Sequence, residues 1–303
     1  MPRSSCVFLA RVLACAPLLI LGASALAQDP APPAPLPEPV LLRHAAAAEA
    51  PKRFYVQRIA TRERRPKEGV HAPSEMTLDW QAERSAGAEA ELLHERVRLR
   101  GLKTGARNRL GDWVEIDSRS EEFARGERQP KLREQVQRML ASDVLVRFTT
   151  RGELREIAGA EKLFEAGEKQ EQRVEELRSM LRLALPIFGA EPVSLGSKWS
   201  YELSYSIGNW LGGHHLKLRC HAEVKSREGE VLGIEERWEL LGDGGRVASG
   251  YTFREGHSSY RFDARRGVLL ERKVQLFYGE PEHGAEYEVE LRASDADPFA
   301  RAR

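Results

Sequence analysis

The sequence of 303 residues predicts an α+β fold that is mainly β: two curved, half-barrel-like antiparallel β-meanders joined through a long amphipathic helix. Three observations lead to this class. Apolar and polar residues alternate over many short segments, as in strands with one buried face. The links between these segments are short, which favours antiparallel neighbours because parallel ones need crossovers of about a dozen residues. One longer segment instead repeats its apolar residues at helical spacing.

The first element, residues 1–27, has the anatomy of an export signal. Apolar residues 12–21 follow Arg3 and Arg11 and precede an Ala-Leu-Ala sequence, after which cleavage would leave Gln28 first. We therefore expect a signal peptide and a protein exported to the periplasm or the cell envelope.

Cys15 allows an alternative, a lipoprotein signal that would leave a lipid anchor on the mature N-terminus. Arg11 argues against it, because an apolar segment should precede the modified cysteine. Cys6 also lies in the signal, so the mature chain keeps only Cys220 and cannot close a disulfide within one chain.

The balance of charge argues against nucleic acid as a partner. The chain has 47 Lys and Arg and 46 Asp and Glu residues, and loss of two arginines with the signal leaves a net charge of about −1. Such a chain has no global field to hold a polyanion. After the signal, no apolar run approaches the roughly 18 residues that a membrane span needs, so we expect no transmembrane segment.

Residues 28–51 form a spacer rich in Pro and Ala, a composition that stays extended and adds little to a core. Residues 52–158 form the N-terminal meander, which includes a short helix with Pro130 at its first position. One face of that helix carries Leu132, Val136, Met139 and Leu140. Alternation predicts strands of this meander at 53–61, 75–83, 92–101, 111–118, 144–150 and 153–158.

Residues 159–186 form the connecting helix, which Pro186 ends. We expect Glu165 and Lys169 to form an i,i+4 pair on its polar side. Its apolar stripe, which a sheet must cover, consists of Val174, Leu177, Leu181 and Leu185.

Residues 187–293 form the C-terminal antiparallel meander, and residues 294–303 form a tail. Alternation is clearest over 199–207 and 216–224, and it directs Cys220 inward. Further strands are predicted at 230–241, 246–254, 258–263, 267–278 and 285–292.

A short motif opens this second meander. Leu185-Pro186 is followed by Pro192-Val193, then by Gly196 and Trp199 at the start of a strand. In this motif the sequence resembles a functionally uncharacterised family of exported, β-rich bacterial envelope proteins. The resemblance implies a β-rich secreted domain and no agreed activity. In strand and helix order the sequence is also similar to the open β-barrel cradles that carry lipids or lipoproteins across the periplasm.

Catalytic and cofactor motifs do not emerge from the sequence, so we expect no enzyme, no metal and no cofactor. Residues 256–260 fail the Gly-x-Ser-x-Gly pattern at their last position. Cys220 and His221 are adjacent in a strand and point to opposite faces, so the imidazole cannot readily activate the thiol. His215 and His221 share a face but lie roughly 20 Å apart, too far for one zinc ion.

Two charged residues occupy positions where the alternation places apolar ones. Glu236 lies among Leu232, Ile234, Trp238 and Leu240, and Arg272 lies in an equivalent series. An unpaired buried charge costs several kcal/mol. The two side chains must therefore pair with each other, line a water-filled cavity or be turned toward solvent by a β-bulge. An acid and a base among aromatics suit an amphiphilic ligand. The candidate cavity-lining residues are Trp199, Tyr201, Tyr205, Glu236, Trp238, Tyr251, Phe253 and Arg272.

A basic row, Arg96, Arg98 and Arg100, follows one strand face and could meet an anionic envelope polymer. Asp79 and Glu83 on the preceding strand offer a simpler explanation, neutralisation across the strands.

We therefore expect a noncatalytic exported envelope protein that binds a lipid or other amphiphile, or another envelope component. One alternative is a structural or protein-interaction module that presents the basic row to an envelope protein or polymer. A hydrolase whose active site is assembled from distant residues is a third alternative.

Overall fold

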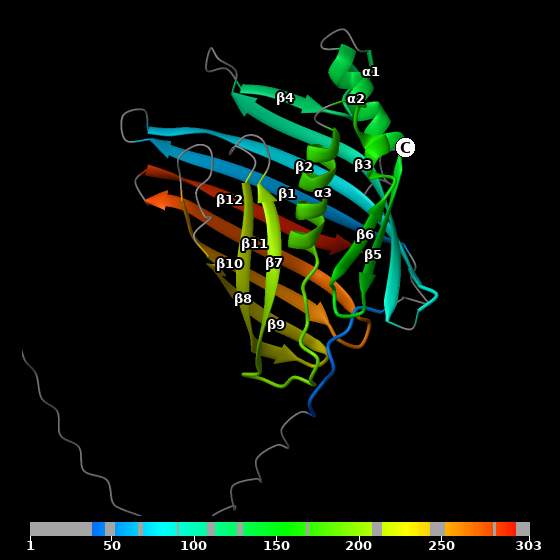
Figure 1. Cartoon of the computed structure of the whole chain (residues 1–303). Helices are drawn as coiled ribbons and strands as arrows, with labels where there is room; N and C mark the ends of the chain where they lie inside the picture. Colours follow the sequence, from blue (N-terminus) through cyan, green and yellow to red (C-terminus); the bar gives the residue numbers. More distant parts are fainter. Residues whose placement is uncertain are drawn as a thin grey trace, which may run out of the picture. The chain divides into compact units, whose positions relative to one another are not determined.

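Among the described residues, twelve antiparallel strands form one sheet with the order β6-β5-β3-β2-β1-β12-β11-β10-β9-β8-β7, and β4 pairs with β3 off this path (Figure 1). The strands are β1 (Lys52–Arg65), β2 (Gly69–Ala86), β3 (Leu92–Arg107), β4 (Trp113–Asp117), β5 (Asp143–Thr149), β6 (Leu154–Ala158), β7 (Lys198–Ile207), β8 (His214–Glu228), β9 (Val231–Leu240), β10 (Phe253–Asp263), β11 (Val268–Glu280) and β12 (His283–Ser294). The helices are α1 (Glu121–Arg125), α2 (Pro130–Ala141), the 3₁₀ helix η1 (Ala160–Leu163) and α3 (Gln170–Ala184).

This computed structural model describes residues 38–45, 52–65, 69–89, 91–107, 113–125, 130–167, 170–207, 214–242, 252–280 and 283–294. All of them belong to one unit, Glu38–Arg303. The expected signal, most of the spacer and Tyr251 lie outside the described residues.

The predicted fold class is confirmed: the chain is mainly β, with an antiparallel sheet that does not close. The structure adds a second junction between the two meanders. Strand β1 pairs with β12 from Phe54↔Ser294 to Arg64↔Gly284, so β1–β6 and β7–β12 share a single sheet. Local alternation cannot reveal this pairing, because it joins strands from opposite ends of the fold.

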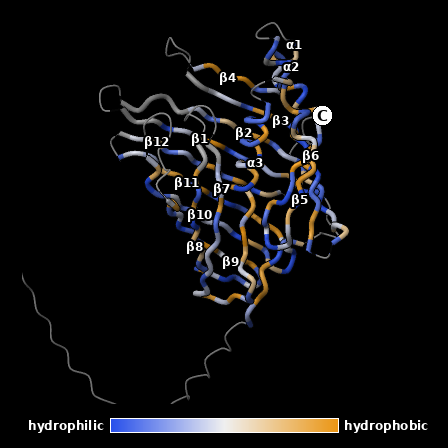
Figure 2. The backbone as a smooth tube through the Cα atoms, viewed as in Figure 1, coloured by the Kyte–Doolittle hydropathy of each residue, from blue (hydrophilic) through white to orange (hydrophobic). Residues whose placement is uncertain are grey.

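Alternation gives the sheet two chemically different faces, which appear as alternating colours along the strands in Figure 2. The register aligns Leu291, Arg272, Tyr260 and Ile234 in one row across β12, β11, β10 and β9. All four are buried, as are Trp238, Phe262 and Leu218 on the same side. We call this side the inner face. Cys220 is fully buried on it, as predicted.

Helix α3 lies in front of the inner face. The sheet curls so that β7 on one side and β5 and β6 on the other flank the helix (Figure 1). The helix contacts β7 and η1, and it buries Leu177 and Leu183.

The predicted helix over 159–186 is shorter among the described residues, where α3 spans Gln170–Ala184. Of the expected Glu165–Lys169 pair, Lys169 lies outside the described residues. Leu163 ends η1 in the core, and Phe164 takes an extended conformation that turns the chain away from the helical path. Glu165 therefore lies outside α3.

The predicted strands 246–254 and 258–263 correspond to one strand, β10, in the described part of that segment. Gly256 lies within β10. The Trp238 side chain packs against it, 3.1 Å from where a Cβ would lie, so glycine makes room for the indole.

Candidate binding site

A cavity of about 50 Å³ lies between α3 and the inner face. By comparison, one water needs roughly 10 to 15 Å³ of such space, so the cavity has room for a few non-hydrogen atoms. Most of its wall is apolar, and the polar groups gather on β1, β2 and β3 and on the segment before β1. The lining residues are His44, Tyr55, Gln57, Trp80, Ala82, Arg84, Glu95, Val97, Val146, Leu181, Ala184, Leu185, Leu269 and Leu291.

Gln57 and Trp80 face each other across β1 and β2. Gln57 is 4% exposed, and its Oε1 accepts a hydrogen bond of 3.0 Å from the indole Nε1 of Trp80. An indole nitrogen can only donate, which fixes which end of the amide faces it. Gln57 Nε2 then has no hydrogen-bond partner among the described residues.

Arg84 and Glu95 form a directly opposed pair on β2 and β3. Arg84 Nη2 lies 2.7 Å from Glu95 Oε2, and its Nη1 donates to the carbonyl of Gly267 at 3.3 Å. The guanidinium also lies over the Phe148 ring, 5.0 Å from its centroid. The positive charge at the cavity is therefore neutralised within the protein.

His44 comes from a strap, residues 38–45, which crosses one end of the inner face. The strap joins both meanders: Val40 pairs with Val193, and the His44 amide donates to the Thr150 carbonyl at 2.7 Å. Leu42 and His44 are each 1% exposed. Burial, followed by the charge of Arg84, lowers the pKa of His44 to about 3, so the imidazole is neutral at physiological pH.

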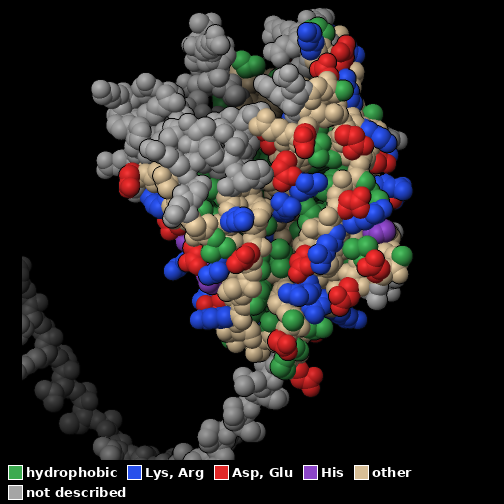
Figure 3. Space-filling model, in the orientation of Figure 1, with side chains coloured by type: hydrophobic (Ala, Val, Ile, Leu, Met, Phe, Trp, Pro, Cys, Tyr) green, Lys and Arg blue, Asp and Glu red, His purple; other side chains and the backbone are tan. Residues whose placement is uncertain are grey.

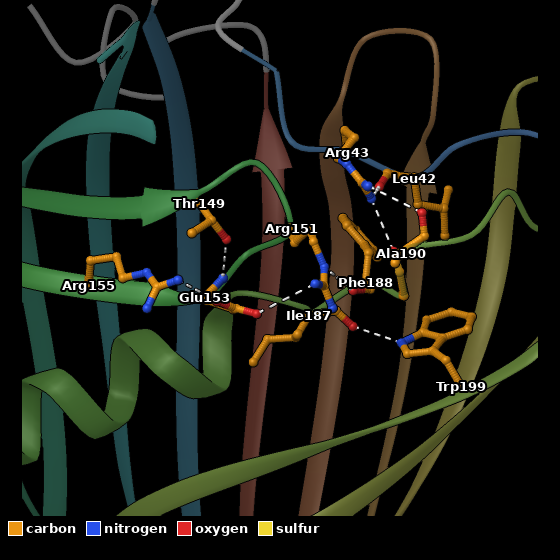
Figure 4. Close-up of polar contacts among 11 residues, drawn as sticks. Leu42, Arg43, Thr149, Arg151, Glu153, Arg155, Ile187, Phe188, Ala190 and Trp199 are labelled. Carbon is orange, nitrogen blue, oxygen red and sulfur yellow. Dashed lines mark hydrogen bonds and ion pairs between the residues drawn. The ribbon is translucent and has the colours of Figure 1, made fainter. Parts of the chain in front are cut away.

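The segment 186–190, which follows α3, is held in place by side chains rather than by a strand partner (Figure 4). Each of its five carbonyl groups accepts a side-chain hydrogen bond of 2.8 to 3.3 Å. His44 donates to Pro186, Trp199 to Ile187 and Arg151 to Phe188. Arg43 donates to both Gly189 and Ala190. Gly152, with φ of 94°, makes room for this segment, because a Cβ there would collide with the Pro186 carbonyl. The C-terminal end of the helix over the cavity is thereby fixed to both meanders.

Glu236 and Arg272, predicted to lie on the inner face, are buried there as an ion pair. Arg272 Nη2 lies 2.7 Å from Glu236 Oε2, with the two side chains 2% and 0% exposed. Glu236 also accepts hydrogen bonds from Tyr201 Oη at 2.7 Å and Trp238 Nε1 at 3.2 Å. Ser258 Oγ receives a 3.1 Å bond from Arg272 Nε. We call these five residues the buried polar cluster.

The other predicted cavity residues lie around this cluster. Trp199 is half-buried and donates to the Ile187 carbonyl at 2.8 Å. Tyr205 is buried, and Phe253 packs edge-on against Tyr278. None of the described candidates lines the cavity beneath α3. That they line a cavity of their own stays a prediction.

Cys220 lies beside the buried polar cluster, opposite Trp238 in the register. Burial, followed by the charge of Glu236, raises the pKa of its thiol well above the ordinary range. The sulfur therefore stays protonated, which argues against a thiolate nucleophile.

The basic row lies on the outer face, and Arg96, Arg98 and Arg100 are all exposed. The expected neutralisation by Asp79 is wrong: Asp79 pairs with Arg119, which covers it. Arg98 instead pairs with Asp143 on β5, with a bond of 2.9 Å from Nη2. Glu83 lies opposite Arg96 in the register but forms an ion pair with Lys52 at 3.4 Å.

The outer face also has a larger hollow, of about 290 Å³, over β8 to β12. Charged side chains of both signs line it and pair with one another, as Arg261 does with Glu271 at 3.7 Å and Lys273 with Glu290 at 3.5 Å. The same intermingling of charge, with apolar side chains between, covers the face seen in Figure 3. The cavity beneath α3 differs because its wall is mainly apolar.

The residues of this cavity were not singled out from the sequence, although a signal for three of them exists. Gln57, Arg84 and Glu95 occupy inward positions in alternating strands, as Glu236 and Arg272 do. His44 lies in a segment without periodicity, and no local pattern marks it.

Fold and site together define a class: a mainly β protein with an open antiparallel sheet curled around a cavity that a helix covers. No family model matches the chain, and no curated protein matches it. Among solved structures, the chain is similar to Rv2717c from M. tuberculosis, with 10% identity over 83% of this chain and 99% of that one and a TM-score of 0.28.

Two MucB structures are also similar. One is MucB in complex with MucA(peri), with 8% identity and a TM-score of 0.13. The other is the Pseudomonas aeruginosa MucA/MucB complex, with 11% identity and a TM-score of 0.12. Each match covers 82% of this chain and 91% of the other. TM-scores this low carry no conclusion about function.

Within the described ranges, no helix combines the length and apolar character needed to cross a membrane. Nor do three His, Cys, Asp or Glu side chains of those ranges come together in a group that could hold a metal ion.

Proposed function

We propose that this protein is a noncatalytic, exported component of the bacterial envelope that binds a small apolar or amphiphilic molecule beneath α3. The observation that carries the proposal is the cavity itself: a mainly apolar wall contributed by a helix and a sheet, with a few polar groups at one side, is the usual design of a small-molecule site. Its volume suits a short chain or one end of a longer molecule.

Export is supported by the sequence of residues 1–27, with cleavage before Gln28 as the proposed processing step and a lipid anchor on Cys15 as the alternative. The motif around Pro192 and Trp199 supports membership in the family of exported envelope proteins. The intact mass of protein purified from its own host distinguishes the two processing routes, since it corresponds either to a chain that begins at Gln28 or to one that begins at a lipidated Cys15.

We predict that Ala184→Leu reduces binding to the cavity at least tenfold. Ala184, the last residue of α3, lines the cavity, and three extra carbon atoms would occupy much of it. Native mass spectrometry of protein from its own host measures the retained molecule. Ala141→Leu, at the exposed last residue of α2, is the matched control and keeps the retained molecule. Equal retention in both variants would remove the cavity as the site.

A second candidate function, a protein- or polymer-binding module, is favoured by the exposed basic row. Arg96 and Arg100 are both exposed, so an anionic partner can reach them. Capture from envelope extracts by the protein and by a variant with Arg96, Arg98 and Arg100 changed to Glu tests it, and unchanged capture removes the row as a binding surface.

A further inference from the structure

The cavity beneath α3 contains two buried polar atoms with no partner among the described residues, Gln57 Nε2 and His44 Nδ1. Leaving a buried donor or acceptor unpaired costs roughly 1 to 3 kcal/mol each. Both residues line the same cavity, so a bound group that reaches both atoms would satisfy both.

Their hydrogen-bonding roles follow from their other contacts. Gln57 presents an N–H donor, because Trp80 holds the oxygen end of its amide. His44 Nε2 lies 3.1 Å from the Pro186 carbonyl, which can only accept, so Nε2 carries the proton. The Nδ1 atom of the neutral ring is then an acceptor.

A donor and an acceptor on two residues that line one cavity match a group that both accepts and donates. A hydroxyl group does both. A carboxylate only accepts, so its lone pairs would repel the lone pair of His44 Nδ1. An ammonium group only donates and would face the N–H of Gln57.

The charges around the cavity also favour a hydroxyl over a charged group. The charged side chains among the described lining residues, Arg84 and Glu95, pair with each other, so this wall holds no net charge for an ionic ligand. The rest of the wall includes Val97, Val146 and Leu181, against which a buried charge would be costly and an alkyl chain favourable.

On these grounds, and resting on the proposed function, we propose that the cavity binds an uncharged aliphatic alcohol through its hydroxyl group. The hydroxyl accepts from Gln57 Nε2 and donates to His44 Nδ1, and its alkyl chain lies against the apolar wall. The hydroxyl belongs either to a free short alcohol or to the head of a larger uncharged amphiphile.

The test compares four probes with a four-carbon chain by isothermal titration calorimetry at pH 8: 1-butanol, butyrate, butylamine and 1-chlorobutane. We expect 1-butanol to bind at least tenfold more tightly than the other three. Butyrate or butylamine binding as tightly as 1-butanol would overturn the hydroxyl proposal and leave apolar binding intact. If none of the four binds, the proposed function itself fails.

A fifth probe, 1-monooctanoylglycerol, separates the two sources of the hydroxyl group. Its binding indicates the head of an amphiphile, and its exclusion indicates a free alcohol.

Gln57→Leu removes the donor and should weaken 1-butanol at least tenfold without changing 1-chlorobutane. Gln137→Leu makes the same change at an exposed position of α2 and should leave the binding of both probes unaffected.

Since Gln57→Leu also removes the hydrogen-bond acceptor of Trp80, a second readout uses the unaltered protein: the ¹⁵N chemical shift of His44 Nδ1. It should move on addition of 1-butanol and not of 1-chlorobutane, and an unmoved resonance at saturating 1-butanol would contradict the proposal.

Discussion

Arg272→Met should lower the free energy of unfolding by about 3 to 5 kcal/mol, because it leaves the carboxylate of Glu236 buried without its cationic partner. Glu236 is 3% exposed, and the hydrogen bonds from Tyr201 and Trp238 do not replace a positive charge. Urea denaturation monitored by circular dichroism measures the change.

The double variant Glu236→Gln/Arg272→Met is the control for this result. Its single amide oxygen can replace Oε2 and accept from Trp238, and its amide nitrogen can donate to the Tyr201 hydroxyl, which also accepts, so we expect it to recover most of the lost stability. A single variant that costs less than about 1 kcal/mol, or a double variant no more stable than the single one, would show that the pair is not the source of the effect.

Acid should destabilise the protein through His44. Burial lowers its folded-state pKa to about 3, from an ordinary 6.5. Between these two values the unfolded chain binds a proton that the folded chain does not, so stability falls as the pH falls. The loss is about 1.4 kcal/mol per pH unit, or about 2 kcal/mol between pH 6.5 and pH 5, and it stops below about pH 3.

His44→Gln removes this titration while keeping an N–H for the Pro186 carbonyl, and we expect its free energy of unfolding to depend less on pH over the same range. His221→Gln makes the same change on the exposed outer face of β8, away from the cavity, and is the matched control. Urea unfolding at pH 7, 6 and 5 distinguishes them. A slope that His44→Gln leaves unchanged would exclude His44 as the titrating group.

Much of the fold could be predicted from the sequence, because period-two alternation directly records which side of a strand is buried. The segment 216–224 shows this well: its odd and even positions differ completely in polarity, and Cys220 is buried as the pattern requires. The pairing of β1 with β12 could not be predicted, since it depends on which strand edges meet in space. Nor could the packing of Trp238 over Gly256 be predicted, because alternation records which side of a strand is buried and not which side chain covers a given residue.

The site was less accessible from the sequence than the fold. Polar residues at inward positions identified the Glu236–Arg272 pair and could equally have identified Arg84 and Glu95, which the alternation of β2 and β3 directs inward. The sequence cannot tell which such pair fills the interior and which borders a cavity, because that depends on where α3 lies. His44 reaches the cavity from a segment with no periodic pattern.

The pairing of β1 with β12 also bears on how the chain reaches its native state. Strand β1 can form its hairpin with β2 early in synthesis, but its other edge has no native neighbour until the last strand of the sheet has been made. During that interval an unpaired strand edge is open to association with other chains. A chaperone that shields nascent β1, or slow release of the chain into the compartment where it folds, would therefore raise the yield of folded protein.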